Sequence, residues 1–285
     1  MLVIEAPEVF RNSGDLRAKQ SNHDPRDPAF SHRRVVIDLS RCQSVAPAAA
    51  MWCLVYALLV RIRSDECGLR LPDAIEPTNY LRSTMLLSIL SASGADVADR
   101  GFDRPYDSLP ILALTKFDSR HEVEEAANNA SEVLARTGRV AANLIPVVGE
   151  SFIELANNAV EHADSRIGSF DLIHLNGFPS KPAIVCAVAD GGIGIRQSLR
   201  QNRQFTERLP FDWVAADLAR EEGVTGTGDN VRGFGLFGVA EDTLQTGRTL
   251  LIQSGRGIFH MTKDLRRAGK SRLFPGTIVV ASIPC

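Results

Sequence analysis

The chain has 285 residues, of which 44% are hydrophobic, and its formal net charge is -2 at pH 7. A chain of this length and hydrophobic content can supply the cores of two domains. The near-neutral charge gives no general reason to expect nucleic acid or an acidic lipid surface as a partner, and we expect neither.

The N-terminal residues indicate neither export nor membrane insertion. Residues 1–10 include Glu5 and Glu8 and lack the basic start and apolar core of a signal peptide, so a cytoplasmic protein is expected. The uncharged run at 45–60 is shorter than the ~20 residues that a membrane-spanning helix needs, and it contains Pro47. We therefore expect a buried helix in this run and no membrane partner.

The first part of the chain predicts a small α/β domain. Residues 1–34 are mostly polar and contain Pro25 and Pro28, and they are expected to form a partly disordered lead-in. Apolar and β-branched runs then predict a domain over residues 35–104. Its expected elements are a strand at 35–40, a helix at 48–64, a strand at 68–71 and a helix at 79–93.

The remaining residues, 105–285, predict a second α/β domain that begins near a Pro-containing linker at 102–110. Its expected helices are at 120–137, 143–163, 211–222 and 236–244, and its expected strands are at 111–115, 170–176 and 183–189. The whole chain is therefore predicted to be an α/β (α+β) protein with two domains.

Three polar side chains recur every four residues on the predicted helix at 143–163. Glu154, Asn158 and His162 should project from one face of that helix. An Asn side-chain oxygen together with phosphate oxygens is a plausible partial shell for magnesium. Glu154 could orient or deprotonate a nucleophile.

Two glycine clusters follow. Asp190 ends an apolar strand and precedes Gly191-Gly192-Ile193-Gly194, so its carboxylate could accept a hydrogen bond from an amine such as that of adenine. The segment 232–238, Arg-Gly-Phe-Gly-Leu-Phe-Gly, joins a loop rich in Gly and Thr to a predicted helix, where backbone N–H groups suit phosphate. Arg232 could add a cation near a terminal phosphate, although an exposed structural arginine is an equally good interpretation.

In this order the three clusters resemble the N box and the two glycine boxes of the GHKL ATPase superfamily, which includes gyrase, sensor histidine kinases and anti-sigma-factor serine kinases. Gly276-Thr277 followed by the apolar run 278–284 resembles the closing strand of that family. The resemblance extends from about Phe117 to the end of the chain. It implies a Bergerat-type α/β sandwich that binds ATP and magnesium.

The resemblance also implies roles for individual residues. Glu154 corresponds to the catalytic base, Asn158 to the magnesium ligand, and Asp190 and Thr277 to the adenine contacts. The other residues that it assigns to the nucleotide are His162, Gly192, Gly194, Ile195, Arg232, Gly233, Gly235 and Leu236. The loop at 223–230 corresponds to the mobile ATP lid of the family.

The segment 35–94 resembles a STAS domain, the fold of anti-sigma-factor antagonists, through its strand, its Asp38-Leu39-Ser40 turn and its long helix. Phosphorylatable members carry Ser at the start of that helix, where this chain has Pro47, and Ser44 is out of register. We therefore expect that this domain is not a phosphoacceptor in the usual way. The alternative is an α/β packing module without a STAS relationship.

Together these resemblances lead us to expect Mg-ATP-dependent phosphoryl transfer to Ser or Thr of a protein partner, itself a STAS or sigma-regulatory protein. One alternative is an ATP-gated interaction switch with little or no turnover. Another is a histidine-kinase-like ATPase, for which His121 is the candidate acceptor. Homodimer formation is left open.

Overall fold

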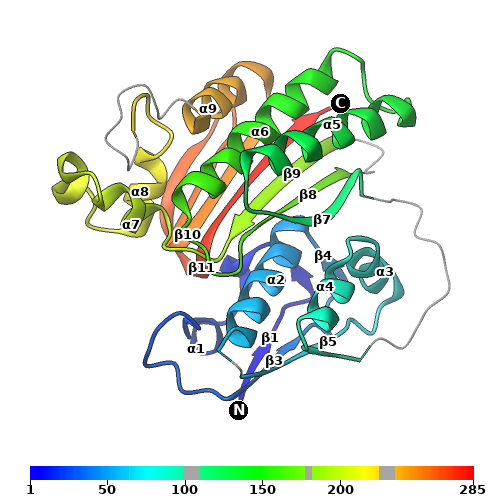
Figure 1. Cartoon of the computed structure of the whole chain (residues 1–285), viewed down its shortest axis with the longest axis vertical. Coiled ribbons are helices and arrows are strands. Elements are labelled where there is room, and N and C mark those ends of the chain that lie inside the picture. Colours follow the sequence, from blue (N-terminus) through cyan, green and yellow to red (C-terminus); the bar gives the residue numbers. More distant parts are fainter. Residues whose placement is uncertain (64, 99–109, 177–181, 225–234) are drawn as a thin grey trace.

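The computed structural model describes residues 1–63, 65–98, 110–176, 182–224 and 235–285. It is a mixed α/β structure with both parallel and antiparallel strand pairs, which confirms the predicted fold class at this coarse level. The N-terminal residues form a parallel sheet and the C-terminal residues form a larger antiparallel sheet (Figure 1).

The N-terminal module is built on the parallel sheet, with strand order β1-β3-β5-β6. These strands are Leu2–Glu5, Arg34–Asp38, Glu66–Arg70 and Asp96–Val97. The helix α2 (Pro47–Arg61) connects β3 to its parallel neighbour β5, the crossover that a parallel pair requires. Pro47 is the first residue of α2, where its missing N–H removes no helical hydrogen bond. The shorter elements of this module are β2 (Val9–Phe10), η1 (Ser13–Asp15), α1 (Ala18–Ser21), β4 (Ser44–Val45), α3 (Ile75–Ser83) and α4 (Leu86–Ala92).

Two expectations for this module are corrected. The lead-in begins with an ordered strand, because β1 pairs in parallel with β3 and buries Ile4 completely. The single helix predicted at 79–93 is the pair α3 and α4. Met85 lies between them with φ of 66°, in the left-handed region, which interrupts a right-handed helix.

The antiparallel sheet has the strand order β10-β11-β9-β8-β7. Its strands are β7 (Leu112–Phe117), β8 (Ser169–Asn176), β9 (Ala183–Asp190), β10 (Thr249–Met261) and β11 (Arg266–Pro284). Three helices cover one face of this sheet, namely α5 (Arg120–Thr137), α6 (Leu144–His162) and α9 (Gly235–Thr246) (Figure 1). α5 has the predicted bounds because Ser119 and Glu122 form a capping box at its start.

Alternate residues of the central strands belong to two different cores. On β9, Cys186 and Val188 pack with α5 and α6, whereas Val185 and Ala187 pack with α2 on the opposite face. β9 is thus apolar along its whole length because both of its faces are covered. Trp52 of α2 is fully buried between the sheets, and its Nε1–H donates to the Leu273 carbonyl oxygen at 3.1 Å. The two modules therefore share a continuous hydrophobic core.

The connection from β9 to α9 contains α7 (Ile195–Arg200), η2 (Arg203–Arg208) and α8 (Asp212–Leu218). The helix predicted at 211–222 is shorter than expected, and α7 was not predicted. Most of the predicted linker at 102–110 and of the predicted lid at 223–230 lies outside the described residues.

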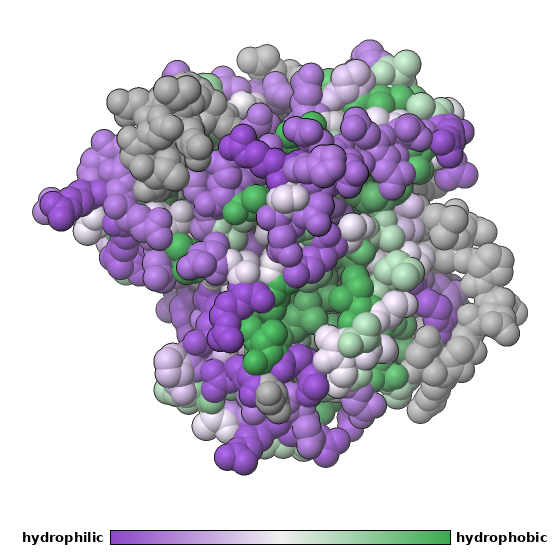
Figure 2. Space-filling view, in the orientation of Figure 1, coloured by the Kyte–Doolittle hydropathy of each residue, from purple (hydrophilic) through white to green (hydrophobic). Residues whose placement is uncertain are grey.

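Hydrophilic residues cover most of the face seen in Figure 2, and apolar residues gather along the seam between the modules, over the region of α2. In the part of the chain that the structure describes, no helix has both the length and the apolar character needed to cross a bilayer.

Candidate functional site

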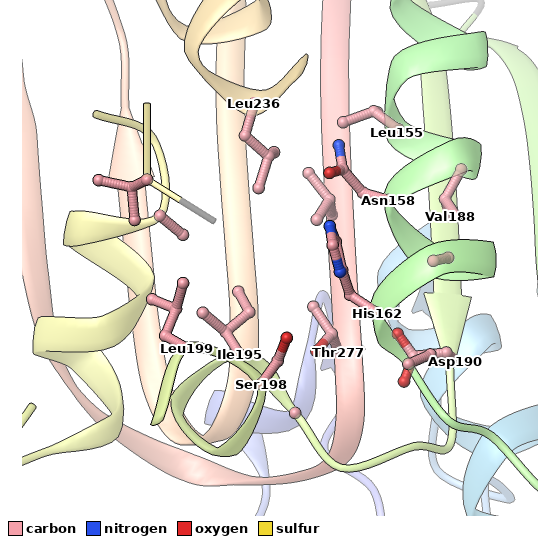
Figure 3. Close-up of a pocket in the computed structure, with 16 residues that line it drawn as sticks. Leu155, Asn158, His162, Val188, Asp190, Ile195, Ser198, Leu199, Leu236 and Thr277 are labelled. Carbon is pink, nitrogen blue, oxygen red and sulfur yellow. The ribbon is translucent and has the colours of Figure 1, made fainter. Parts of the chain in front are cut away.

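A cavity lies on the helix-covered face of the antiparallel sheet, between α6 on one side and α7 and α8 on the other (Figure 3). Its lining is mainly apolar, from Leu155, Ala159, Ala163, Val188, Ile195, Leu199, Ala219, Val224, Leu236 and Val279. The polar side chains that line it are Asn158, His162, Asp190, Ser198 and Thr277. An apolar cavity with a few convergent polar groups is typical of a small-molecule site.

The helix α6 supplies one wall of the cavity. Asn158 and His162 lie one turn apart and both point into it (Figure 3). The Asn158 Nδ2 donates to the Glu154 carbonyl oxygen at 2.7 Å, which leaves the side-chain oxygen facing the cavity. Glu154 is exposed and does not line the cavity. The predicted polar helix face therefore brings two of its three residues to the site.

Asp190 and Thr277 meet because β9 and β11 are paired with these two residues opposite each other. On the other side of Thr277, Ser254 of β10 occupies the facing position. The Ser254 Oγ lies 3.1 Å from Thr277 Oγ1 and accepts the Ile195 backbone N–H at 2.9 Å. Ser254 does not line the cavity, but it supports the lining residues Thr277 and Ile195, a role that the sequence reasoning missed. The sequence signal for it was the pair Ser254-Gly255, which follows the apolar run Leu250-Leu251-Ile252 after one residue.

The Asp190 carboxylate is buried at the end of β9. Burial raises its pKa to about 6, and hydrogen bonds from the Gly192 and Thr277 backbones and the charge of Arg26 oppose that rise. The Gly192 N–H donates to Asp190 Oδ1 at 2.8 Å. At neutral pH the carboxylate is therefore mainly ionised and can accept a hydrogen bond from a ligand.

Close backbone contacts explain two of the glycines beside Asp190. A Cβ at Gly192 would lie 1.7 Å from the Ala163 carbonyl oxygen at the end of α6, and a Cβ at Gly276 would lie 2.0 Å from the Asp190 carbonyl oxygen. Gly192 does not line the cavity, so its position against α6 is structural. Gly194 does line it, and its φ of 80° turns the chain into α7.

The structure places the other predicted site residues as follows. Ile195 and Leu236 line the cavity from the first turns of α7 and α9, and Gly235 is the first residue of α9. Arg232 and Gly233 lie outside the described residues. Besides Ser254, the sequence reasoning missed Ser198 and most of the apolar lining, since an apolar residue on a helix does not indicate whether it faces a core or a cavity.

The residues that line the cavity could hold an apolar ring that carries an amine. Its apolar walls can surround the ring, and Asp190 and Thr277, which are paired on neighbouring strands, supply hydrogen-bonding groups side by side. Within the described ranges, no group of three or more His, Cys, Asp or Glu side chains could hold a metal ion. The Asn158 oxygen fits magnesium only as one ligand beside phosphate oxygens, which is the usual arrangement for this ion.

No protein-family model matches this chain, and no curated protein matches it. The residues and geometry described above are therefore the basis for any function.

Proposed function

We propose that this chain is an ATP-binding regulatory protein with a GHKL-type site, and that it transfers a phosphoryl group from Mg-ATP to Ser or Thr of a protein partner. The observation that carries the proposal is the convergence of Asn158, His162, Asp190 and Thr277, from three elements, on one apolar cavity. We further propose that the antiparallel sheet with its helices is a Bergerat-type domain and that the N-terminal module is STAS-like.

Each of these groups has a role in the proposed site. Asp190 accepts a hydrogen bond from the amine of the base, and Thr277 lies beside it. Asn158 contributes an oxygen to magnesium, and His162, one turn further along α6, lies between Asn158 and the Asp190–Thr277 pair (Figure 3). Glu154 is the candidate base, at an exposed position one turn before Asn158. When bound, Mg-ATP supplies the phosphoryl group and the cation that neutralises it.

The arrangement of the modules favours an acceptor on another protein. α2 packs on the face of the antiparallel sheet opposite α6 and the cavity, so the sheet separates Pro47 from the proposed phosphoryl donor. The position that resembles the phosphoacceptor of STAS proteins is therefore out of reach within one chain.

Calorimetric titration with ATP and magnesium tests the binding step. We expect binding in the wild-type protein, loss of binding in Asp190→Asn, and weaker magnesium-dependent binding in Asn158→Ala. Asp171→Asn is the matched control, because Asp171 is another buried aspartate of the same sheet that does not line the cavity. A folded wild-type protein that binds no nucleotide would refute the proposal.

A second candidate function is an ATP-gated interaction switch without turnover. The observation that favours it is the exposure of Glu154, whose side chain does not line the cavity. Phosphate release and partner labelling, followed in wild type and Glu154→Gln, distinguish the two functions. A kinase loses labelling in the variant while it keeps ATP binding, whereas a switch shows neither labelling nor turnover in either protein.

A further inference from the structure

A second cavity lies on the other side of the glycine loop that follows Asp190. Its walls are the loop 24–27, the end of α2 and residues 191–193. The N-terminal segment, expected to be a partly disordered lead-in, thus reaches the back of the proposed nucleotide site.

Arg26 makes the direct contact between these two parts of the chain. Its Nη1 donates to the Gly192 carbonyl oxygen. The Asp24 carboxylate holds the guanidinium from the other side, at 2.7 Å from Nη2 and 3.0 Å from Nε. Because the Gly192 N–H donates to Asp190, Arg26 and Asp190 hold opposite ends of one residue. Because the Arg26 guanidinium is bound on both sides, its position as well as its charge is fixed relative to the Asp190 loop.

The segment that carries Arg26 is itself attached to the rest of the N-terminal module. The Tyr56 hydroxyl of α2 donates to the His23 carbonyl oxygen at 2.8 Å. Arg63, just beyond α2, donates to the Phe30 carbonyl oxygen at 2.9 Å. Arg256 of β10 donates to the Asn22 carbonyl oxygen at 3.1 Å. Residues 22–30 therefore bridge α2 and the Asp190 loop.

The Asp190 loop also touches α2 without an intervening residue. A Cβ at Gly191 would lie 3.2 Å from Leu59 Cδ2 and 2.7 Å from Ile167 Cδ1. The loop is thus held between α6, which Gly192 contacts, and α2. A displacement of either α2 or residues 22–30 must shift the position of Asp190, because the interior is close-packed.

We propose that Arg26 is a positioning residue of the base pocket, and that through it the N-terminal module regulates nucleotide affinity. This inference rests on the proposed function for its nucleotide readout. Its structural part, that Arg26 holds the Asp190 loop, is measured separately without any ligand.

The ligand-free test is hydrogen exchange of the backbone amides of residues 190–195 in the full-length protein. Removing the guanidinium in Arg26→Ala should speed exchange of this segment. Arg11→Ala is the matched control, because Arg11 forms an ion pair with Asp15 in the same N-terminal segment but has no contact with the loop among the described residues. Unchanged exchange in Arg26→Ala would overturn the proposal.

The Asp190 carboxyl provides a readout that a purely structural role would not move. The other charged or titratable groups around the two cavities are Asp24, Asp27, Arg63, Asp164, Arg166 and His162. Among the cations, the charge of Arg26 is the one that lowers the pKa of Asp190. A carboxyl carbon NMR titration should therefore give a higher pKa for Asp190 in Arg26→Ala, and a nearly unchanged one in Arg26→Lys and Arg11→Ala.

The nucleotide readout is the dissociation constant of Mg-ATP. We expect it to rise about tenfold in Arg26→Ala, the change that corresponds to one lost charge-assisted hydrogen bond, and to stay within twofold in Arg11→Ala.

Wild-type protein that binds no ATP, with faster exchange in Arg26→Ala, would refute the proposed function and leave the positioning contact standing. Equal affinities for wild type and Arg26→Ala would overturn the regulatory inference alone. If Arg26→Ala does not fold, Asp24→Asn is the test variant, because it frees the Arg26 guanidinium from its ion pair. Amide exchange of residues 190–195 should then be faster and the dissociation constant of Mg-ATP higher than in the wild type. Unchanged exchange and affinity in Asp24→Asn would contradict the proposal.

Discussion

Replacing Asp171 with Asn should stabilise the protein at neutral pH and flatten the pH dependence of its stability. Asp171 lies on β8, is fully buried and faces the core under α5 and α6. Neither carboxylate oxygen makes a well-formed hydrogen bond with a described residue. Burial raises the pKa of Asp171 to about 8, and the Thr115 backbone lowers it only in part. The folded protein therefore keeps a proton here that the unfolded chain releases.

The sign and magnitude follow from proton linkage. The folded pKa is above the unfolded value of about 3.9, so stability is highest at low pH, falls as the pH rises through this range and levels off above about 8. Each pH unit inside the range costs about 1.4 kcal/mol, so Asp171 accounts for a loss of about 2 kcal/mol between about pH 6.5 and 8. Other buried groups act outside this window. Asp190 titrates near 6, burial of His174 lowers its pKa from 6.5, and burial raises the pKa of the Cys186 thiol to about 12.

The assay is urea unfolding at three pH values across this window, with a shared slope of free energy against denaturant. The wild-type free energy of unfolding should fall by about 2 kcal/mol, whereas that of Asp171→Asn should stay nearly constant and exceed the wild-type value at the upper end. Asp264→Asn, at the exposed turn between β10 and β11, should keep the wild-type dependence. Parallel curves for wild type and Asp171→Asn would refute the reasoning, since they would mean that this carboxyl has no raised pKa in the folded state.

Adenosine affinity should fall about tenfold per unit below about pH 6, because burial raises the pKa of Asp190 to about 6 and only the ionised carboxylate accepts the amine hydrogen bond without competition. Titrations with adenosine at one pH above 6 and one below 6 measure this change in affinity, and adenosine has no phosphate that would itself titrate. Equal affinities at the two pH values would exclude the contact between Asp190 and the amine. Gly192→Ala should cost more than about 2 kcal/mol, because its Cβ would lie 1.7 Å from the Ala163 carbonyl oxygen, whereas Gly238→Ala has open space and should be neutral or stabilising by up to about 1 kcal/mol. Chemical unfolding compares the pair, and equal stabilities would contradict the close approach. Trp52→Ala should cost about 3–5 kcal/mol, and Trp52→Phe about 1–3 kcal/mol from the carbonyl of β11 that loses its donor. If thermal and urea unfolding show no loss for Trp52→Ala, the shared core between the modules is wrong.

Local sequence signals determined most of the helices and strands. The run at 120–137, which is dense in Glu and Ala, predicted α5 with the bounds observed, and in the structure a capping box between Ser119 and Glu122 fixes its start. The β-branched run at 35–40 and the apolar run at 183–189 predicted β3 and β9 to within about two residues. These signals act between neighbours in the chain, so they can be recognised without the fold. Where a tertiary contact decided the outcome, as at β1, which needs β3 beside it, the local signal was not enough.

The candidate site divides in the same way. The spacing of Asn158 and His162 and the Asp-Gly-Gly pattern at Asp190 were visible in the sequence, because a helix turn and a strand end are local features. Only the tertiary structure decided that Glu154 stays outside the cavity and that Ser254 supports two of its lining residues, Thr277 and Ile195. The same holds for the burial of Asp171 without a strong partner and for the contact of Arg26 with Gly192. Each of these outcomes depends on which residues, distant in the sequence, a side chain contacts. The register of β9 with β11 and the packing of α2 between two sheets determine those contacts, and the periodicity of a single segment does not.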